Sequence, residues 1–223
     1  MLTKGYLLAY NGTLLAGWTY VALQVIKNRL SGGSLETLYP LIKKALAVSQ
    51  SAAVLEILHA ATGLVRSAVP TTFIQVMSRL LVLWGAVEIG SKNVTNSWWF
   101  TQMVIAWTLS ELVRYSYYLI GLVKGKKIPA WLTWLRYSAF IVLYPMGITG
   151  EIGCLVKALP HLLQHGTYSV KLPNKWNFIF NFHSFILFGL GVLYPPGSYV
   201  MYTHMLKQRS KALAKANEDA KNE

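Results

Sequence analysis

Residues 130–155 read AWLTWLRYSAFIVLYPMGITGEIGCL, with Arg136 and Glu151 as the charged side chains of the run. The run is longer than the roughly 20 mostly apolar residues that a helix needs to cross the hydrocarbon core of a membrane. Aromatic rings near its start suit the membrane–water interface. The stretch therefore predicts a transmembrane helix with a carboxyl group set deep within it.

The rest of the chain has the same character. Of its 223 residues, 54% are hydrophobic and only 13% are charged, and the mean hydropathy is +0.39. That charged share is about half of what soluble domains carry, and a soluble chain of this length could not bury so much apolar surface. The composition excludes a disordered chain and a disulfide scaffold and argues against a cytosolic enzyme. The single cysteine, Cys154, can form no internal disulfide.

Apolar runs predict an all-helical membrane protein, a bundle of six transmembrane helices. Pro160 is expected to open the longest loop, and Pro195-Pro196-Gly197 to close the last span. An even number of spans places both termini on one side, and a slight excess of Lys and Arg there favours the cytoplasm. The predicted spans cover residues 6–26, 45–65, 72–89, 98–123, 130–155 and 176–196.

Basic residues collect between the spans and in the C-terminal tail. The formal net charge is +13. In a membrane protein such charges are expected to face anionic lipid head groups or an anionic substrate, rather than nucleic acid. We expect one transmembrane unit over residues 1–206 and a polar, cytoplasmic tail over residues 207–223.

Ionisable side chains inside the predicted spans are the candidates for function. Each costs roughly 2.5–3.5 kcal/mol at the bilayer centre on insertion scales, so it is expected to face the bundle interior or a wet cavity. Glu111 and Arg114 are three residues apart and can pair on one helix face, as a structural or a substrate-positioning pair. Arg79 could pair with an acid or meet phosphates, and Arg136 could snorkel to the interface. The full set is Glu56, His59, Arg79, Glu88, Glu111, Arg114, Arg136 and Glu151.

Metal binding is not expected from the histidine and cysteine positions. Glu56 and His59 have the spacing of a helical metal half-site, but no second such pair completes it. His161 and His165 are four apart in a predicted loop, with no acid or cysteine nearby to assist them. Cys154 lacks the arginine six residues later that a phosphatase loop requires, and we interpret it as a small apolar residue.

Tyr144 and Glu151 have a spacing that allows chemistry. Seven residues apart, they share one face of a helix and lie about 10.5 Å apart along its axis. Pro145 is expected to bend this helix, and Gly147 and Gly150 to leave a hollow beside it. A phenol and a buried carboxyl suit the addition or removal of water next to a thioester, which requires no metal or redox cofactor. Such a pair also arises without any catalytic role, so the spacing alone does not establish that Tyr144 and Glu151 are catalytic.

The segment Leu143–Glu151, LYPMGITGE, resembles the active-site segment of the very-long-chain 3-hydroxyacyl-CoA dehydratases, a family once called protein tyrosine phosphatase-like. The likeness extends from about Tyr10 to Arg209, and the sequence is most similar to the plant form of the family. Further segments agree in the family's order: AVLEILH at 53–59 with Gly63, Val65, Arg66 and Ser67; Gln75 with Ser78 and Arg79; and Trp107 with Glu111, Arg114 and Tyr115.

The resemblance implies a six-span enzyme of the endoplasmic reticulum. It implies dehydration of very-long-chain (3R)-3-hydroxyacyl-CoA to trans-2-enoyl-CoA, the third step of fatty acid elongation, and contact with the condensing enzyme and the two reductases of that cycle. It places the catalytic pair on Tyr144 and Glu151. Which of the two removes the carbon-bound proton stays open; Glu151 is expected as the principal acid–base group and Tyr144 as its proton-relay partner.

Other residues are expected to hold the substrate. An apolar tunnel between the helices would take the acyl chain. The CoA phosphates would meet a basic rim of Lys124, Lys126, Lys127 and Lys207. Residues expected to position the substrate are Arg136, Tyr137, Glu111, Arg114, Tyr115, Glu56, His59 and Arg79.

Two other classes of protein stay open from the sequence. A non-catalytic member could be a membrane scaffold of the elongation complex, although retention of Tyr144 and Glu151 argues against this. A small transporter could also carry charges in its spans, but it would need two similar halves, and no inverted repeat is evident.

Overall fold

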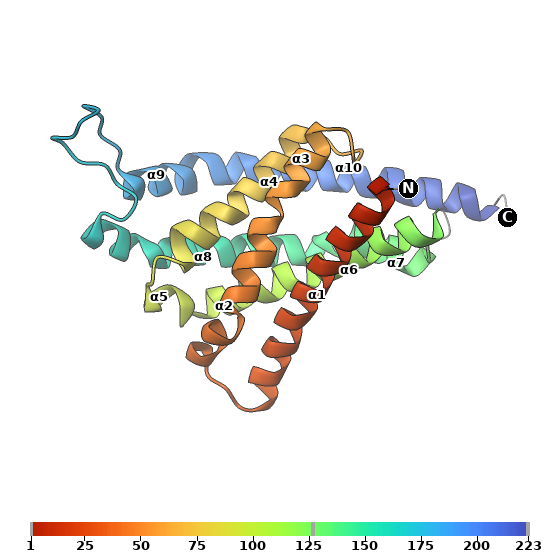
Figure 1. Ribbon diagram of the computed structural model, residues 1–223, viewed down its shortest axis with the longest axis horizontal. Helices are drawn as coiled ribbons and strands as arrows, with labels where there is room; N and C mark the ends of the chain where they lie inside the picture. Colours follow the sequence, from red (N-terminus) through yellow and green to blue (C-terminus); the bar gives the residue numbers. More distant parts are fainter. Residues whose placement is uncertain (1, 126–127, 222–223) are drawn as a thin grey trace.

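A computed structural model describes residues 2–125 and 128–221, with side chains up to Ala214. The described chain is all-helical and has no strand, as expected, apart from one isolated bridge between Val170 and Phe180. Figure 1 shows long helices packed side by side, with the hairpin that follows α8 projecting from one end. The helices are α1 (Leu2–Leu30), α2 (Leu35–Ala52), α3 (Val54–Ala61), α4 (Val69–Val82), η1 (Leu83–Val87, a π-helix), α5 (Lys92–Thr95), α6 (Trp98–Lys124), α7 (Ala130–Ser138), α8 (Phe140–His165), α9 (Phe182–Phe188), η2 (Gly189–Leu193, a π-helix) and α10 (Tyr194–Lys221).

Helix α6 forms the centre of the bundle, with α1 and α8 packed against it. Gly150 makes the α6–α8 contact possible, because a Cβ atom there would lie 2.8 Å from the backbone nitrogen of Met103. The prediction that Gly150 leaves a hollow was wrong, since the backbone of α6 fills that space. Gly147, one turn earlier, does border a cavity.

Within the described residues, three helical segments are long and apolar enough to cross a membrane: Val69–Val87, Ala130–His165 and Phe182–Ala214. They correspond to the third, fifth and sixth predicted spans. The runs predicted as the first, second and fourth spans fall on α1, on α2 with α3, and on α6. These helices bury polar side chains inside the bundle, which lowers their mean hydropathy. The buried polar residues include Asn11, Asn28, Ser49, Gln50, Thr101, Thr108 and Glu111.

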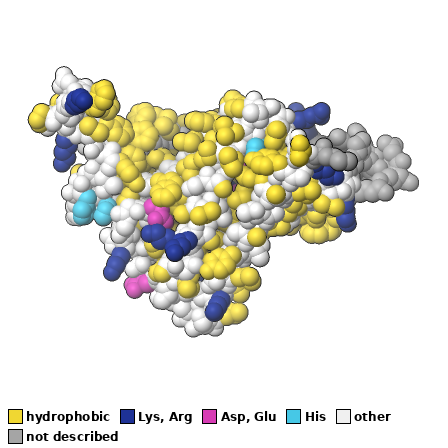
Figure 2. Space-filling model, in the orientation of Figure 1, with side chains coloured by type: hydrophobic (Ala, Val, Ile, Leu, Met, Phe, Trp, Pro, Cys, Tyr) yellow, Lys and Arg dark blue, Asp and Glu magenta, His cyan; other side chains and the backbone are white. Residues whose placement is uncertain are grey.

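The surface is apolar over much of its area, as suits contact with lipid. Figure 2 shows apolar side chains spread across one face, with charged side chains gathered in a few places. Phe188 and Val192, which do not line the cavity described below, are 53% and 52% exposed on the last helical segment. In Figure 1 the two ends of the chain lie toward the same end of the molecule.

The predicted start of the fifth span at Ala130 agrees with the structure, whereas its predicted end at Leu155 was wrong. Helix α8 runs through Pro160 to His165 instead of ending before that proline. Pro160 and Val156 both lie on the exposed side of the helix. Because proline has no backbone N–H, the carbonyl of Val156 has no hydrogen-bond donor four residues later. The helix is interrupted at Ala139, between α7 and α8, whereas Pro145 lies inside α8.

The predicted limits of the sixth span were also wrong. Trp176 lies in the loop before α9 with 81% of its surface exposed, and the helix begins at Phe182. At the other end, Pro195 and Pro196 do not close the span. They lie at the start of α10, directly after the π-helix η2, and the helical segment continues through them. The polar tail is therefore helical and continuous with α10 as far as Lys221.

Candidate active site

A cavity of about 980 Å³ lies among α3, α4, α6, α7, α8 and α10. Nine of the ten residues expected to catalyse the reaction or to position the substrate line it, although these residues come from distant parts of the chain. Tyr115 is fully buried behind the wall, where it contacts a lining residue. The predicted site residues that line the cavity are Glu56, His59, Arg79, Glu111, Arg114, Arg136, Tyr137, Tyr144 and Glu151.

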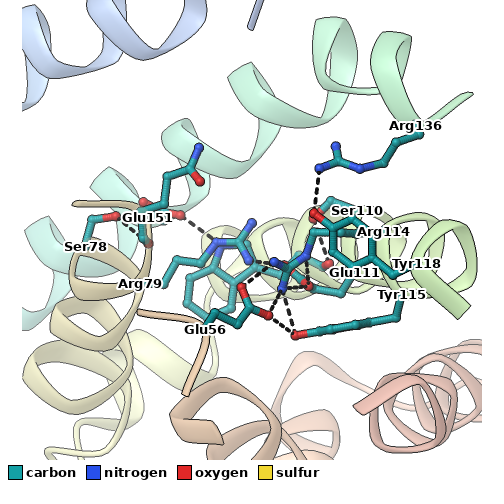
Figure 3. A network of polar contacts seen from close by, with 12 residues as sticks. Glu56, Ser78, Arg79, Ser110, Glu111, Arg114, Tyr115, Tyr118, Arg136 and Glu151 are labelled. Carbon is teal, nitrogen blue, oxygen red and sulfur yellow. Dashed lines mark hydrogen bonds and ion pairs between the residues drawn. The ribbon is translucent and has the colours of Figure 1, made fainter. Parts of the chain in front are cut away.

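Two carboxylates and two guanidinium groups form a continuous ion network in the wall (Figure 3). Arg79 of α4 donates to Glu111 of α6. Arg114 donates to the same carboxylate at 2.8 Å, which confirms the predicted pairing within α6. Its Nη1 and Nη2 also reach Glu56 of α3 at 2.5 and 2.8 Å. The network neutralises its own charges and ties three helices together.

Tyr115 completes the network at Glu56. Its hydroxyl donates to Oε1 of that carboxylate over 2.6 Å. His59, one turn from Glu56, belongs to a different contact, since its Nε2 lies 2.8 Å from the hydroxyl of Tyr6. Glu56 and His59 therefore act with separate partners, and not as the half-site of a metal.

No group of three or more His, Cys, Asp or Glu residues in the described chain lies close enough to hold a metal ion. His161 and His165 stack with their ring centroids 4.1 Å apart, on the last turns of α8 and not in a loop. Cys154 is buried in the apolar core, as interpreted from the sequence.

Glu151 is held quite differently from Glu56 and Glu111. It is 7% exposed, and Trp107 of α6 donates its indole Nε1–H to Oε1 over 2.8 Å. The hydroxyl of Tyr194 of α10 donates to Oε2 over 3.3 Å. In the described part of the chain no Lys, Arg or His forms an ion pair with it. Glu151 is thus a buried acid bonded by neutral donors on a cavity wall.

Tyr144 lines the same cavity from about two turns nearer the start of α8. Its hydroxyl lies 3.5 Å from the backbone oxygen of Ser198, and its ring centroid lies 6.0 Å from that of Tyr202. Within the described residues no hydrogen bond joins Tyr144 directly to Glu151. The phenol bonded to Glu151 is Tyr194, which sequence analysis missed. The one local signal was a tyrosine placed immediately before two prolines in an apolar run.

The remaining predicted positions fall at the end of the cavity near α7. Arg136 is half-buried, with its guanidinium 5.8 and 5.7 Å from the ring centroids of Tyr118 and Tyr137. It faces the cavity wall instead of snorkelling outward. Lys124 is exposed at the last residue of α6 and does not line the cavity, whereas Lys207 lines a smaller pocket beside it. Lys126 and Lys127 lie outside the described residues.

The fold and site define a helical membrane protein with an acid buried on the wall of a large internal cavity. The family model described as "Protein tyrosine phosphatase-like protein, PTPLA" matches residues 50–215, and the chain belongs to this family. The resemblance found in the sequence motifs is confirmed.

Curated relatives cover nearly the whole chain. The mouse "Very-long-chain (3R)-3-hydroxyacyl-CoA dehydratase 2" is 42% identical over 218 residues, 98% of this chain and 84% of the relative. The rice dehydratase PASTICCINO 2B is 43% identical over 212 residues, 95% and 94% of the two chains. The Arabidopsis thaliana dehydratase PASTICCINO 2 is 42% identical over 214 residues, 96% and 95%. Plant forms are thus among the relatives, with a mouse form at a similar identity. No solved structure matches.

Proposed function

We propose that the protein dehydrates very-long-chain (3R)-3-hydroxyacyl-CoA to trans-2-enoyl-CoA, the third step of fatty acid elongation, with Glu151 and Tyr144 as its catalytic residues. One structural observation carries the assignment. Of the three carboxyl groups that line the cavity, Glu56 and Glu111 are held in ion pairs, whereas neutral donors alone bond Glu151. Protonating an ion-paired carboxylate leaves an uncompensated buried cation, so Glu151 can exchange a proton at the lowest cost.

The elimination needs one base and one acid. One group removes a proton from C2 of the substrate, and the C–H electron pair forms the C2–C3 double bond. The C3–O bond breaks, and the second group protonates the departing hydroxyl, which leaves as water. Glu151 is the principal acid–base group and Tyr144 its partner, since both groups face the same cavity.

Trp107 and Tyr194 are positioning residues in this proposal. Each donates to a different oxygen of Glu151, so the two bonds fix the plane of the carboxyl group. A rotation of that plane would move the reacting oxygen away from C2, and small displacements of a reacting group are costly to rate. The ion network contributes indirectly. It holds α6 in place, and α6 carries Trp107.

The apolar walls of the cavity suit the acyl chain. On the α9 and α10 side the cavity is lined by aliphatic and aromatic side chains, among them Phe185, Ile186, Leu190 and Leu193. An apolar chain placed there leaves water and gains about 25 cal/mol for each Å² buried. We assign this region as the acyl tunnel of the enzyme.

The membrane arrangement belongs to the same proposal. We assign six spans, with α1, α2 together with α3, and α6 added to the three apolar segments, because α1 and α6 exceed 20 residues and face their polar side chains inward. The two chain ends then share one side of the membrane, the cytoplasmic side of the endoplasmic reticulum. Residues 1–206 form the transmembrane unit and residues 207–223 its polar extension. The other enzymes of the elongation cycle are its partners.

The test is an assay of the purified protein with 3-hydroxyacyl-CoA substrates of several chain lengths, following formation of the enoyl thioester. Wild-type protein is expected to form enoyl-CoA, and Glu151→Gln and Tyr144→Phe are each expected to lose at least a hundredfold in kcat, because general acid–base catalysis contributes about 10²–10⁴-fold. Glu36→Gln and Tyr199→Phe are the matched controls, since both side chains are exposed and neither lines the cavity. A folded Glu151→Gln protein with wild-type turnover would refute the assignment of roles.

A further inference from the structure

A second pocket, of about 450 Å³, opens beside the main cavity near the end of α10. Three residues, Tyr137, His204 and Gln208, line both spaces, so the pocket adjoins the cavity directly. The side chains that line only the smaller pocket are Lys207, Lys211 and Ala212. A molecule held in the main cavity could therefore extend one end into this basic pocket.

The helical repeat places the basic side chains on one face. His204, Lys207, Gln208 and Lys211 are spaced by three and four residues, the spacing of neighbours on one side of a helix. Arg209, on another side of α10, donates its Nε–H to Ser138 Oγ over 3.0 Å and holds this part of α10 against α7, whose Tyr137 lines the pocket. The pocket is thus built from two packed helices and not from one mobile chain end.

The charge of the pocket favours an anion. Among the side chains that the structure describes, up to Ala214, no carboxylate lines the pocket, and neither Lys207 nor Lys211 takes part in an ion pair. Arg136 adds a guanidinium beside Tyr137, one of the lining residues. The nearest carboxylates of the cavity network are already paired with arginines. The pocket therefore offers two lysines and a neighbouring arginine, and such basic side chains are suited to phosphate groups.

The position along α10 matches the shape of an acyl-CoA. Tyr194 bonds Glu151, and Lys207 lies 13 residues later on the same helix, about 20 Å at 1.5 Å per residue. An extended pantetheine arm spans a length of this order between the thioester and the diphosphate. About 20 residues counted from Phe182 cross the hydrocarbon core, so Lys207 lies beyond it, where a water-soluble anion can arrive.

We infer that the pocket between α7 and the end of α10 binds the phosphate groups of the CoA substrate through Lys207 and Lys211. The inference rests on the proposed dehydratase function and deepens it by locating the end of the substrate that carries no reacting atom. It places the phosphate contacts on Lys207 and Lys211, in preference to a rim that includes Lys124. The phosphate of a lipid head group has the same chemistry, so the experiment must separate the two sources.

The test compares two thioesters of the same 3-hydroxyacyl group, one of CoA and one of N-acetylcysteamine, which keeps the reacting atoms but lacks the phosphates. For a Lys207→Gln/Lys211→Gln protein we expect KM for the CoA thioester to rise roughly tenfold or more, because the phosphates lose two charged hydrogen-bond donors. Its kcat on the CoA thioester and its kcat/KM on the N-acetylcysteamine thioester should stay within about twofold of wild type. Lys124→Gln is the matched control, an exposed lysine outside both pockets.

Two further measurements identify the source of the phosphate. Adenosine 3′,5′-bisphosphate should compete with the CoA substrate for wild-type protein and much less for the double variant. An equal loss on both thioesters, or no loss on either, would overturn the inference. So would a wild-type activity that depends on anionic lipid in the vesicles and is insensitive to the bisphosphate, because a head group would then occupy the pocket. Failure of wild-type protein to convert either thioester would instead refute the dehydratase function itself.

Discussion

Trp107 on α6 donates its indole N–H to Oε1 of Glu151 on α8 over 2.8 Å, in the buried core of the bundle. The two residues are 44 positions apart, and the close packing of α6 on α8 brings them together. The bond fixes an acid that has no ion-pair partner in the described structure. It links the packing of the bundle to the geometry of the reacting group.

Tyr194→Phe is expected to lower kcat roughly tenfold and to leave KM within about twofold. The substitution removes a hydroxyl that donates to Glu151 over 3.3 Å and preserves the ring that packs around it. A group that orients the acid acts on the chemical step more than on binding. Steady-state kinetics on a 3-hydroxyacyl-CoA measure both constants.

The control for Tyr194→Phe is Tyr199→Phe on the same helix, whose side chain is 72% exposed. The control should keep wild-type kinetics. A rise in KM with unchanged kcat for Tyr194→Phe would assign the hydroxyl to substrate binding and contradict its positioning role.

Trp107→Phe is expected to lower kcat as well, together with a loss of stability. The indole is 2% exposed, so the smaller ring leaves a void and removes one of the two donors to Glu151, and we expect a loss of about 1–3 kcal/mol. Trp98→Phe, with a ring 59% exposed at the start of the same helix, is the matched control. Thermal unfolding in detergent and kcat on the folded fraction separate the two effects. If the folded Trp107→Phe protein turned over at the wild-type rate, the indole bond would have no part in positioning.

The sequence predicted those features of the site that are local in the chain. The spacing of Glu111 and Arg114 predicts their pairing, because residues three apart are neighbours on one helix. It cannot predict that Arg114 also binds Glu56, which lies 58 positions away on α3. That contact depends on how the helices pack, and helix packing depends on all the side chains at their interfaces.

Tyr194 and Gly150 illustrate the same limit. The tyrosine belongs to the site only because α10 folds back beside α8, and its position before two prolines does not identify Glu151 as its partner. A glycine in a helix has two opposite uses, open space or close contact, and only the position of the next helix distinguishes them. Motif resemblance predicted the acid and the family, whereas the partners of the acid required the fold.

Arg114→Gln is expected to destabilise the protein by about 3 kcal/mol, because it leaves the half-buried Glu56 without a cation and the buried Glu111 with Arg79 alone. Adding Glu56→Gln should recover part of that loss, since the unpaired charge is then removed. Thermal or denaturant unfolding of the two single variants and the double variant gives the coupling between the residues. Strictly additive losses would show that the pair contributes nothing as a pair.

Gly150→Ala is expected to separate α8 from α6 and to impair both stability and turnover. The added Cβ atom would lie 2.8 Å from the backbone nitrogen and 2.9 Å from the Cα of Met103, and backbone atoms cannot rotate away as a side chain can. Overpacking of this kind costs about 1–3 kcal/mol, and it would displace Glu151, the next residue, from Trp107.

Gly12→Ala on α1 is the matched control, because its Cβ would meet no atom within 4 Å. A helical glycine replaced by alanine without a clash gains about 0.5–1 kcal/mol, so the two variants should shift the unfolding temperature in opposite directions. Equal and small shifts would mean that the α6–α8 contact is looser than 2.8 Å implies, and that Glu151 is not held by it.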